Sequence, residues 1–258
     1  MRLYLKYFAI HLKSQMQYKG TFFLNIIGRI LMSFATVAGV LFMFMRFNEV
    51  DGFTLSQTLL CAAVVTMAFS FAEVFARGFD IFPRLLGNGE FDRCLVRPRN
   101  IIFQVAASHI ELIRLGILIN AAAVLCYAIP NSGVIWTWDK ILTLCLMIFC
   151  GALVFFGLYI VYASISFFTV EGLEFMNIIT YGGREFGRYP FSVYGKGILK
   201  FLTFVVPLTL FQYYPLLYLL GREQSVLYML APVISLIFLL PCYVFFRIGL
   251  RHYKSTGS

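Results

Sequence analysis

Long apolar blocks alternate with short clusters of Lys and Arg along this chain, and that alternation limits the folds it can adopt. Of its 258 residues, 60% are hydrophobic and 13% are charged, whereas soluble globular domains carry about a quarter charged residues. The blocks have the ~20 residues that one helical crossing of a ~30 Å hydrocarbon core requires. We therefore expect an all-α integral membrane protein.

The net charge of +9 does not indicate a nucleic-acid-binding protein. The Lys and Arg residues lie at the ends of the apolar blocks, where such residues determine topology beside an anionic leaflet. A nucleic-acid-binding protein would need a continuous basic face, which the sequence lacks. The six cysteines are scattered, without the spacing of a metal site or of a disulfide framework.

The pattern predicts six crossings with both termini in the cytoplasm. Residues 1–19 place Leu5, Phe8 and Leu12 on one helical face and basic residues on another, which is typical of an amphipathic helix lying on the inner membrane surface. A frayed tail that only carries topology charges is the alternative. The spans are expected at residues 20–45, 54–75, 101–129, 140–167, near 171–188, and 225–246.

A polar segment at residues 77–100 interrupts the apolar pattern between the second and third expected spans. It contains five arginines, against one in the loop that follows the first span. This excess of positive charge places the segment, together with the N-terminus, on the cytoplasmic side. We expect this segment to be the part that meets a soluble partner.

Residues 169–225 allow two interpretations. Counting their basic residues as cytoplasmic makes residues 198–220 an ordinary fifth span. Alternatively, a short fifth span covers residues 171–188, and an external hairpin over residues 189–220 dips back into the membrane. A broken helix at membrane depth is tolerated where it packs on protein or lines a cavity. Both interpretations give six crossings.

Some ionisable side chains fall inside the expected spans. Arg29 either extends to the cytoplasmic interface or faces the protein interior. Glu111 and Arg114 are three residues apart, so on a helix they share a face and can neutralise one another. The full set of candidate intramembrane polar contacts is Arg29, Glu111, Arg114, Glu171 and Glu174.

No motif for nucleotide hydrolysis or other catalysis is present in the sequence. The stretch GNGEFDR at residues 87–93 has two glycines but lacks the lysine and the preceding strand of a phosphate-binding loop. The HExxH and GxSxG motifs and a recognisable ion-selectivity filter are also missing, and the intramembrane polar residues form no catalytic cluster. Work done on a substrate would therefore draw its energy from another protein.

Two stretches of the sequence carry a resemblance to a known family. The stretch LLGNGEFDRCLVRPRN (residues 85–100) resembles the cytoplasmic loop of type-2 ABC exporter permeases, and residues 169–222 resemble the second half of the same subgroup. The similarity covers essentially the whole chain. One departure is the Gly195-Lys196-Gly197 step, where the family pattern usually has a bulky residue.

The resemblance implies a six-span permease subunit of the bacterial plasma (inner) membrane, paired with a second permease copy or paralogue. It implies two separate ATPase subunits that bind ATP and Mg, with no cofactor in this chain and no nucleic acid. Membrane lipids surround the spans, and the cargo would be amphipathic or hydrophobic: a drug, a lipid or a peptide. The alternative class is a secondary transporter or channel-like protein without an ATPase partner.

The resemblance also implies roles for two groups of residues, and it favours the external hairpin over a plain fifth span. Residues expected in a coupling helix that docks on the ATPase are Phe82, Leu85, Leu86, Glu90, Phe91, Asp92, Arg93, Leu95 and Arg97. Residues expected in the external gate are Tyr189, Pro190, Pro207, Tyr213, Tyr214 and Pro215. The alternative for residues 82–97 is a solvated loop that only maintains topology. Arg29 and Glu174 would contact cargo or pair between subunits.

Overall fold

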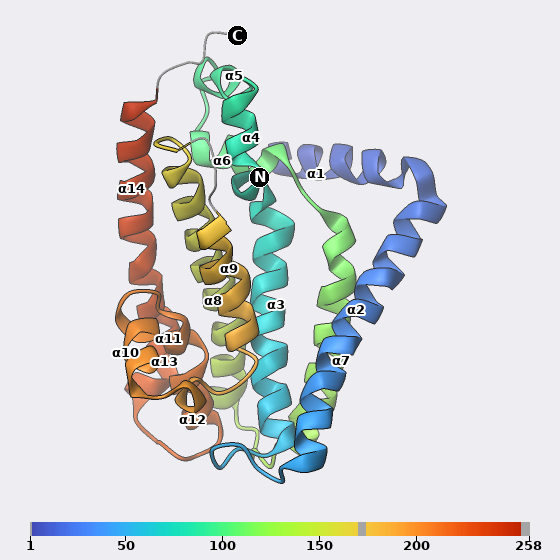
Figure 1. Ribbon diagram of the computed structural model, residues 1–258, viewed down its shortest axis with the longest axis vertical. Coiled ribbons are helices and arrows are strands. Elements are labelled where there is room, and N and C mark those ends of the chain that lie inside the picture. The colour runs from blue at the N-terminus through green and yellow to red at the C-terminus, as the bar shows by residue number, and fades with distance from the viewer. Residues whose placement is uncertain (1, 170–173, 254–258) are drawn as a thin grey trace.

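The computed structural model describes residues 2–169 and 174–253, and all regular elements of this part are helices apart from one isolated bridge between Val50 and Phe53 (Figure 1). The α-helices are α1 (Arg2–Gln15), α2 (Lys19–Arg46), α3 (Leu55–Asp80), α4 (Phe82–Gly87), α5 (Asp92–Leu95), α6 (Ile101–Ser108), α7 (Leu115–Asn131), α8 (Trp138–Ile165), α9 (Glu174–Phe186), α10 (Lys196–Phe204), α11 (Leu208–Phe211), α12 (Tyr213–Leu219), α13 (Val226–Ser235) and α14 (Leu239–His252). Short 3-10 turns lie at Met16–Tyr18, Leu112–Arg114, Phe191–Tyr194 and Leu236–Phe238.

Five helical stretches of the described residues are long and apolar enough to cross a membrane. A sixth candidate is a helix pair, Lys196–Phe204 with Leu208–Leu219, which is bent by 88° and is either one broken span or a re-entrant loop. The expectation of an all-helical membrane protein is confirmed, with five candidate spans, or six if the bent pair counts as one. The five stretches are Lys6–Arg46, Leu55–Gly87, Leu112–Asn131, Trp138–Ile165 and Val226–His252.

The short helix α9 stands where a fifth span was expected at residues 171–188. Its 13 described residues span ~20 Å at 1.5 Å per residue, which is less than the ~30 Å hydrocarbon core. It lies beside α3 and α8 in the bundle (Figure 1). Residues 170–173 lie outside the described residues, so the fifth span remains a prediction.

Segments far apart in the sequence gather at the two ends of the bundle. Helices α1, α4, α5 and α6 and the last turn of α14 lie at one end, at the top of Figure 1. Helices α10 to α12 and the turn that joins α2 to α3 lie toward the other end. The polar segment 77–100 and the expected external hairpin therefore lie toward opposite ends of the bundle (Figure 1).

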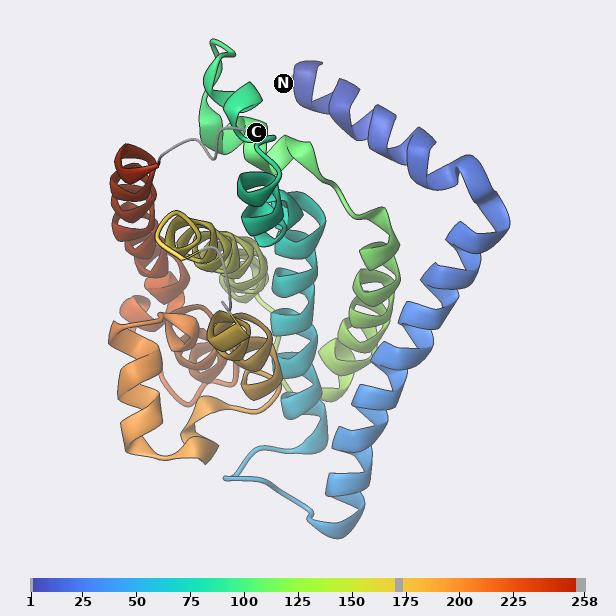
Figure 2. The same ribbon diagram turned by 45° about the horizontal axis from the view of Figure 1, so that its top comes forward.

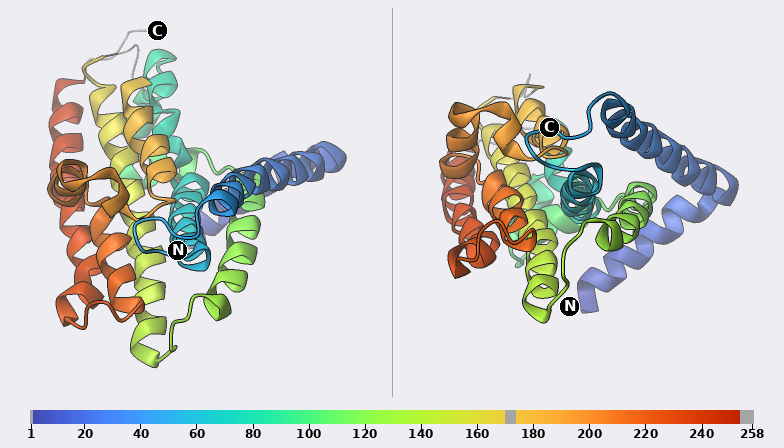
Figure 3. Two further views of the ribbon diagram at one scale, coloured as in Figure 1. Left: turned by 60° about the horizontal axis from the view of Figure 1, so that its bottom comes forward. Right: turned by 90° about the horizontal axis from the view of Figure 1, so that it is seen from below.

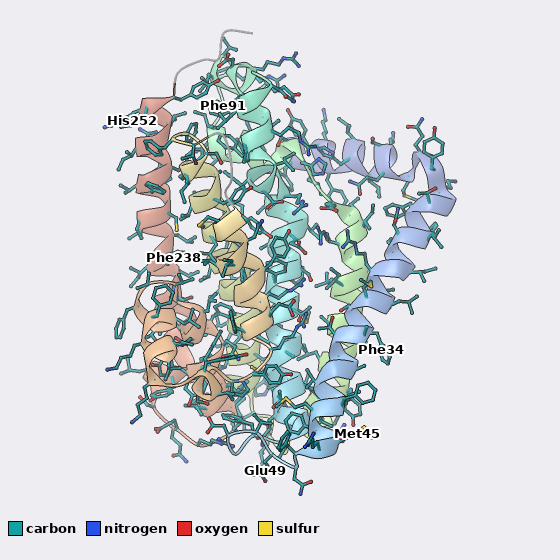
Figure 4. The ribbon with its side chains drawn as sticks, in the orientation of Figure 1. Phe34, Met45, Glu49, Phe91, Phe238 and His252 are labelled. Carbon is teal, nitrogen blue, oxygen red and sulfur yellow. The ribbon has the colours of Figure 1, made fainter. Side chains whose placement is uncertain are left out.

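Helices α1 and α2 form an open V beside the rest of the molecule (Figures 2 and 3). The face of α1 that carries Phe8 and Leu12, together with Met16 in the following 3-10 turn, packs on a small cluster around the buried Phe22 and Leu112. Part of the apolar face of α1, which was expected to contact the membrane, thus packs against this protein instead. Along α2 most side chains are exposed; Figure 4 shows Phe34 and Met45 on its outer side.

The third span is shorter than the sequence predicts, because the helix expected over residues 101–129 is interrupted. Helix α6 ends at Ser108, and His109 is extended, with φ −145° and ψ 122°. The side chain of Gln15 replaces the lost helical hydrogen bonds: its Oε1 accepts from the Leu112 backbone N–H at 3.0 Å, and its Nε2 donates to the Ile110 carbonyl. Irregular backbone inside a membrane protein persists where such partners exist. The apolar crossing therefore begins at Leu112.

Helix α3 runs through the centre of the bundle and packs on both α7 and α8. Its last turns also meet α6 closely, because Gly78 has no side chain. A Cβ at Gly78 would overlap the carbonyl oxygen of Val105 and lie 2.8 Å from Ser108 Oγ. This contact fixes where the chain re-enters the bundle after the polar segment.

We predict that Gly78→Ala separates α3 from α6 and lowers stability by about 1–3 kcal/mol, the usual cost of overpacking. The measurement is the apparent melting temperature of the purified protein in detergent. Gly87→Ala is the matched control, since nothing lies within 4 Å of a Cβ there. Equal melting temperatures for the two variants would contradict the close approach.

Candidate functional site

The polar segment between α3 and α6 is anchored to the protein by aromatic side chains that the sequence predicted for partner docking. Phe82 and Phe91 are completely buried, with ring centroids 5.0 Å apart. Phe82 also contacts Phe167 at 5.1 Å, and Phe91 contacts Tyr253 at 5.1 Å. Figure 4 shows Phe91 at this end of the bundle. These rings connect the segment to the ends of α8 and α14.

The nine predicted coupling residues consequently divide by burial. Phe82, Leu86 and Phe91 face the core of this chain, and Leu85 is half-buried. Asp92 is also half-buried and accepts a hydrogen bond from the Tyr253 hydroxyl at 2.9 Å. The residues left for a partner are exposed: Glu90, Arg93, Leu95 and Arg97.

Two further exposed residues of the same surface were missed by the sequence reasoning. Arg84 is exposed on α4, and Val96 is 84% exposed after α5. An apolar side chain so exposed beside Leu95 is a feature of contact surfaces. We name the exposed set, Arg84, Glu90, Arg93, Leu95, Val96 and Arg97, the outer face of the polar segment.

A second site is an ion-pair cluster where α3 passes the break between α6 and α7. Arg114 Nη1 lies 3.1 Å from Glu73 Oε1, and Arg114 Nε lies 3.3 Å from Glu111 Oε2. Arg77 Nε lies 2.9 Å from the same Glu111 oxygen, and Arg77 also pairs with Asp80. The pairing of Glu111 with Arg114 was predicted, although Glu111 lies in non-helical backbone here instead of a helix.

Sequence reasoning missed the α3 and α9 members of this ion-pair cluster. The Tyr181 hydroxyl of α9 accepts a hydrogen bond from Arg77 Nη1 at 2.8 Å. The Glu73 side chain is fully buried, with 0% exposure. The signal was present in the sequence: Glu73, Arg77 and Asp80 are four and three residues apart, which places them on one face of a helix. The cluster joins α3, the break and α9.

The predicted gate residues lie at and around the bend between α10 and α11. Pro207 occupies the bend itself, with φ −72° and ψ 49°, and is buried. Pro190 and Pro215 are buried as well, whereas Tyr189, Tyr213 and Tyr214 are half-buried. The rings of Tyr213 and Tyr214 are 5.7 Å apart.

Polar side chains that the sequence reasoning did not select hold this bent pair in place. The buried Gln212 donates from Nε2 to the carbonyls of Gly187 at 3.2 Å and Tyr189 at 3.1 Å. Thr209 Oγ1 donates to the Leu202 carbonyl at 3.0 Å, which bridges the bend. The hairpin is therefore joined to the residues that follow α9.

The remaining candidate polar contacts are placed differently. Arg29 lies on α2, outside the ion-pair cluster, and lines a cavity of about 440 Å³ between α2, α3, α7 and α9. Glu171 lies outside the described residues. Glu174 begins α9, and its side chain is not described.

Within the described part of the chain, no group of three or more His, Cys, Asp and Glu side chains is arranged to hold a metal ion. The closest approach of two histidines is the pair His11 and His109, whose rings are 6.0 Å apart. Burial lowers the pKa of His109. His11 Nε2 lies 3.2 Å from the Ala107 carbonyl oxygen, so this histidine helps to fasten α1 to α6.

The fold and its polar sites define a multi-pass, α-helical membrane protein. A family model described as ABC-2 family transporter protein matches residues 30–257. The chain therefore belongs to the ABC-2 transporter family, as a membrane permease component, and the resemblance seen in the sequence is confirmed. Searches of curated proteins and of solved structures give no match.

We predict that Arg114→Met destabilises the bundle by about 3–5 kcal/mol, since it leaves the carboxylate of Glu73 buried without its cation. Adding Glu73→Gln removes that unpaired charge, and we expect the double variant to recover most of the lost stability. The measurement is again the melting temperature in detergent. A double variant no more stable than Arg114→Met would show that the two side chains are not coupled.

Proposed function

We propose that this protein is the permease subunit of an exporter driven by a separate ATPase. Two permease chains, either identical or paralogous, would stand over two ATPase subunits that bind ATP and Mg. The complex would move an amphipathic or hydrophobic cargo outward across a bacterial plasma membrane. Membership of the ABC-2 family supports this proposal over the alternative of a secondary transporter or channel.

The observation that carries the proposal is the way in which the polar segment 77–100 is attached to the bundle. Its outer face is charged and exposed, whereas its inner face is fixed to the bundle by Phe82 and Phe91. A partner that pulls on the outer face would therefore move the ends of α8 and α14 as well. A solvated loop that only maintained topology would not need such rigid anchoring.

The outer face has both signs of charge, which suits docking in a cleft of a soluble protein. Glu90 would meet basic groups or a helix N-terminus of the ATPase, and Arg93 and Arg97 would meet acidic ones. Leu95 and Val96 supply an apolar centre. Asp92, by contrast, is held by Tyr253 and would stabilise the segment from within.

The orientation proposed for the bundle puts the polar segment in the cytoplasm and the bent hairpin outside. The excess of arginines in residues 77–100 supports the first placement. Helix α1 crosses the long axis of the bundle at the same end (Figure 1), as an interfacial helix would. Lys196 and Lys200 are exposed on α10, a helix that lies toward the opposite end (Figure 1), where they would meet the outer headgroups.

The exposed side of α2 is proposed to face lipid and the second permease subunit. Phe34 and Met45 are 56% and 81% exposed there, and Figure 4 shows both side chains pointing away from the bundle. On a soluble monomer, a contiguous exposed apolar patch would mark an interaction site.

Charge reversal on the outer face tests the coupling. We predict that the double variant Glu90→Lys/Arg93→Glu reduces copurification of ATP hydrolysis activity with the tagged chain about tenfold, a loss of ~1.4 kcal/mol. Lys196→Glu/Lys200→Glu is the matched control, because it alters two exposed charges toward the other end of the bundle. Undiminished ATPase copurification and export by the first variant would refute the docking proposal.

Cysteine labelling tests the orientation. In a background without the six native cysteines, we expect Lys196→Cys to react with a membrane-impermeant maleimide in intact cells. Asn88→Cys should react only after the cells are opened, because it lies in the polar segment. The reverse pattern would overturn the proposed orientation.

A further inference from the structure

The cavity between α2, α3, α7 and α9 has an unusual distribution of charge for a hollow inside a membrane protein. Four arginines line it: Arg29, Arg114, Arg184 and Arg188. None of the described carboxylates lines it, and its volume is about 440 Å³. A ligand in this cavity would therefore contact guanidinium groups.

Around the cavity, the described carboxylates carry less negative charge than is needed to neutralise the arginines. Among the described side chains, five arginines (Arg29, Arg77, Arg114, Arg184 and Arg188) stand against four carboxylates (Glu73, Asp80, Glu111 and Glu185), which leaves a charge of +1. Arg184 and Arg188 share a single carboxylate, Glu185. Arg29 pairs with no carboxylate whose side chain is described.

Arg29 is well inside α2. It comes ten residues after Lys19, which is ~15 Å along the helix axis at 1.5 Å per residue. A charged side chain at such depth is costly unless it has a counter-ion or reaches water. The packing beside it is close: a Cβ at Gly116 would lie 2.6 Å from the Ile26 carbonyl oxygen, and Asn120 Nδ2 donates to Ser33 Oγ at 2.7 Å. The backbone near Arg29 is thereby held against α7.

The other cationic wall is also held in position. The guanidinium of Arg184 lies over the ring of Phe69, 4.9 Å from its centroid, and its Nη2 lies 2.6 Å from Glu185 Oε1. The Glu185 side chain is 44% exposed, so the pair is not sealed in the core. Fixed guanidinium groups bind phosphate and carboxylate through paired N–H donors.

The rest of the lining suits the apolar part of an amphiphile. Met32, Val37 and Val124 contribute apolar side chains to the same hollow. A second hollow of about 470 Å³ shares Thr36, Val40 and Arg188 with the first and reaches the gate residue Tyr189. A ligand with an anionic head near the arginines could therefore extend toward the bent hairpin.

We propose that this cavity binds the anionic group, a phosphate or a carboxylate, of an amphiphilic molecule. The negative charge would compensate Arg29 and supplement the single carboxylate shared by Arg184 and Arg188. Identifying that molecule as cargo rests on the export function proposed above. The anionic group can belong to a membrane lipid or to a separate amphiphile, and the two sources are distinguished by the experiment.

Native mass spectrometry of the full-length protein tests the proposal. The probes are dioleoylphosphatidylglycerol and oleate, with zwitterionic dioleoylphosphatidylcholine for comparison. We expect Arg29→Gln to weaken binding of one or both anionic probes about tenfold, the loss expected for one charge-assisted contact, and to leave phosphatidylcholine unaffected. Arg46→Gln, at the exposed end of α2 and outside the cavity, should leave all affinities unchanged.

The substituted residues are chosen so that a loss of binding cannot be explained by misfolding. Arg29→Gln unpairs no described carboxylate, and Arg29→Gln/Arg188→Gln still leaves Glu185 with Arg184. Both variants should keep the melting temperature of the parent protein. Unchanged affinity of the double variant for both anionic probes would overturn the proposal, as would equal weakening by Arg46→Gln.

Reconstitution with the copurified ATPase identifies the source of the anion. ATP-dependent movement of fluorescent phosphatidylglycerol between leaflets would identify a lipid, and movement of oleate alone a separate carboxylate amphiphile. Arg29-dependent binding of phosphatidylglycerol without movement of either probe would identify a resident lipid; each of these results supports an anion site. If the proposed export function is wrong, no ATPase copurifies with the parent protein. This result is distinct from a failure of anion binding, which is measured on the permease alone.

Discussion

Charge balance in a low-dielectric bundle is the constraint on which the rest of this structure depends. Glu73 is fully buried on α3, and its charge is tolerable because Arg114 lies 3.1 Å away. Arg114 lies at the late start of the third crossing, just after the non-helical residues 109–111, and from there it reaches Glu73. The break in the helix and the ion-pair cluster therefore occur together. Helix α9 is connected to them by the hydrogen bond from Arg77 to the Tyr181 hydroxyl.

The same region connects the two ends of the molecule. Below the ion-pair cluster, the bent hairpin is attached through Gln212 to the residues that follow α9. Above it, Gly78 holds α3 against α6, and the buried Phe82 and Phe91 fix the polar segment to α8 and α14. A displacement of the outer face would thus be transmitted through packed aromatic rings and paired charges, which resist continuous deformation.

The position of the arginine-lined cavity bears on the proposed export function. It lies between α2, most of whose side chains are exposed, and helices α3, α7 and α9. A movement of α2 relative to α7 would change the spacing of Arg29 from Arg184 and Arg188, and with it the affinity for an anion. Coupling between nucleotide binding and cargo release needs such a difference in affinity between two conformations.

The sequence by itself determined the class of fold, because apolar length and charge clusters are local properties of the chain. The family was identified from the resemblance of residues 85–100 and 169–222, and the family model confirms it. The sequence also identified the pair Glu111 and Arg114 and the polar segment as a whole. Only the tertiary structure decided which face of that segment is exposed, since Phe82 and Phe91 are buried by residues more than seventy positions away, Phe167 and Tyr253. The helix break, the role of Glu73 and the convergence of four arginines on one cavity were likewise decided in three dimensions, because each depends on contacts between helices that no local pattern records.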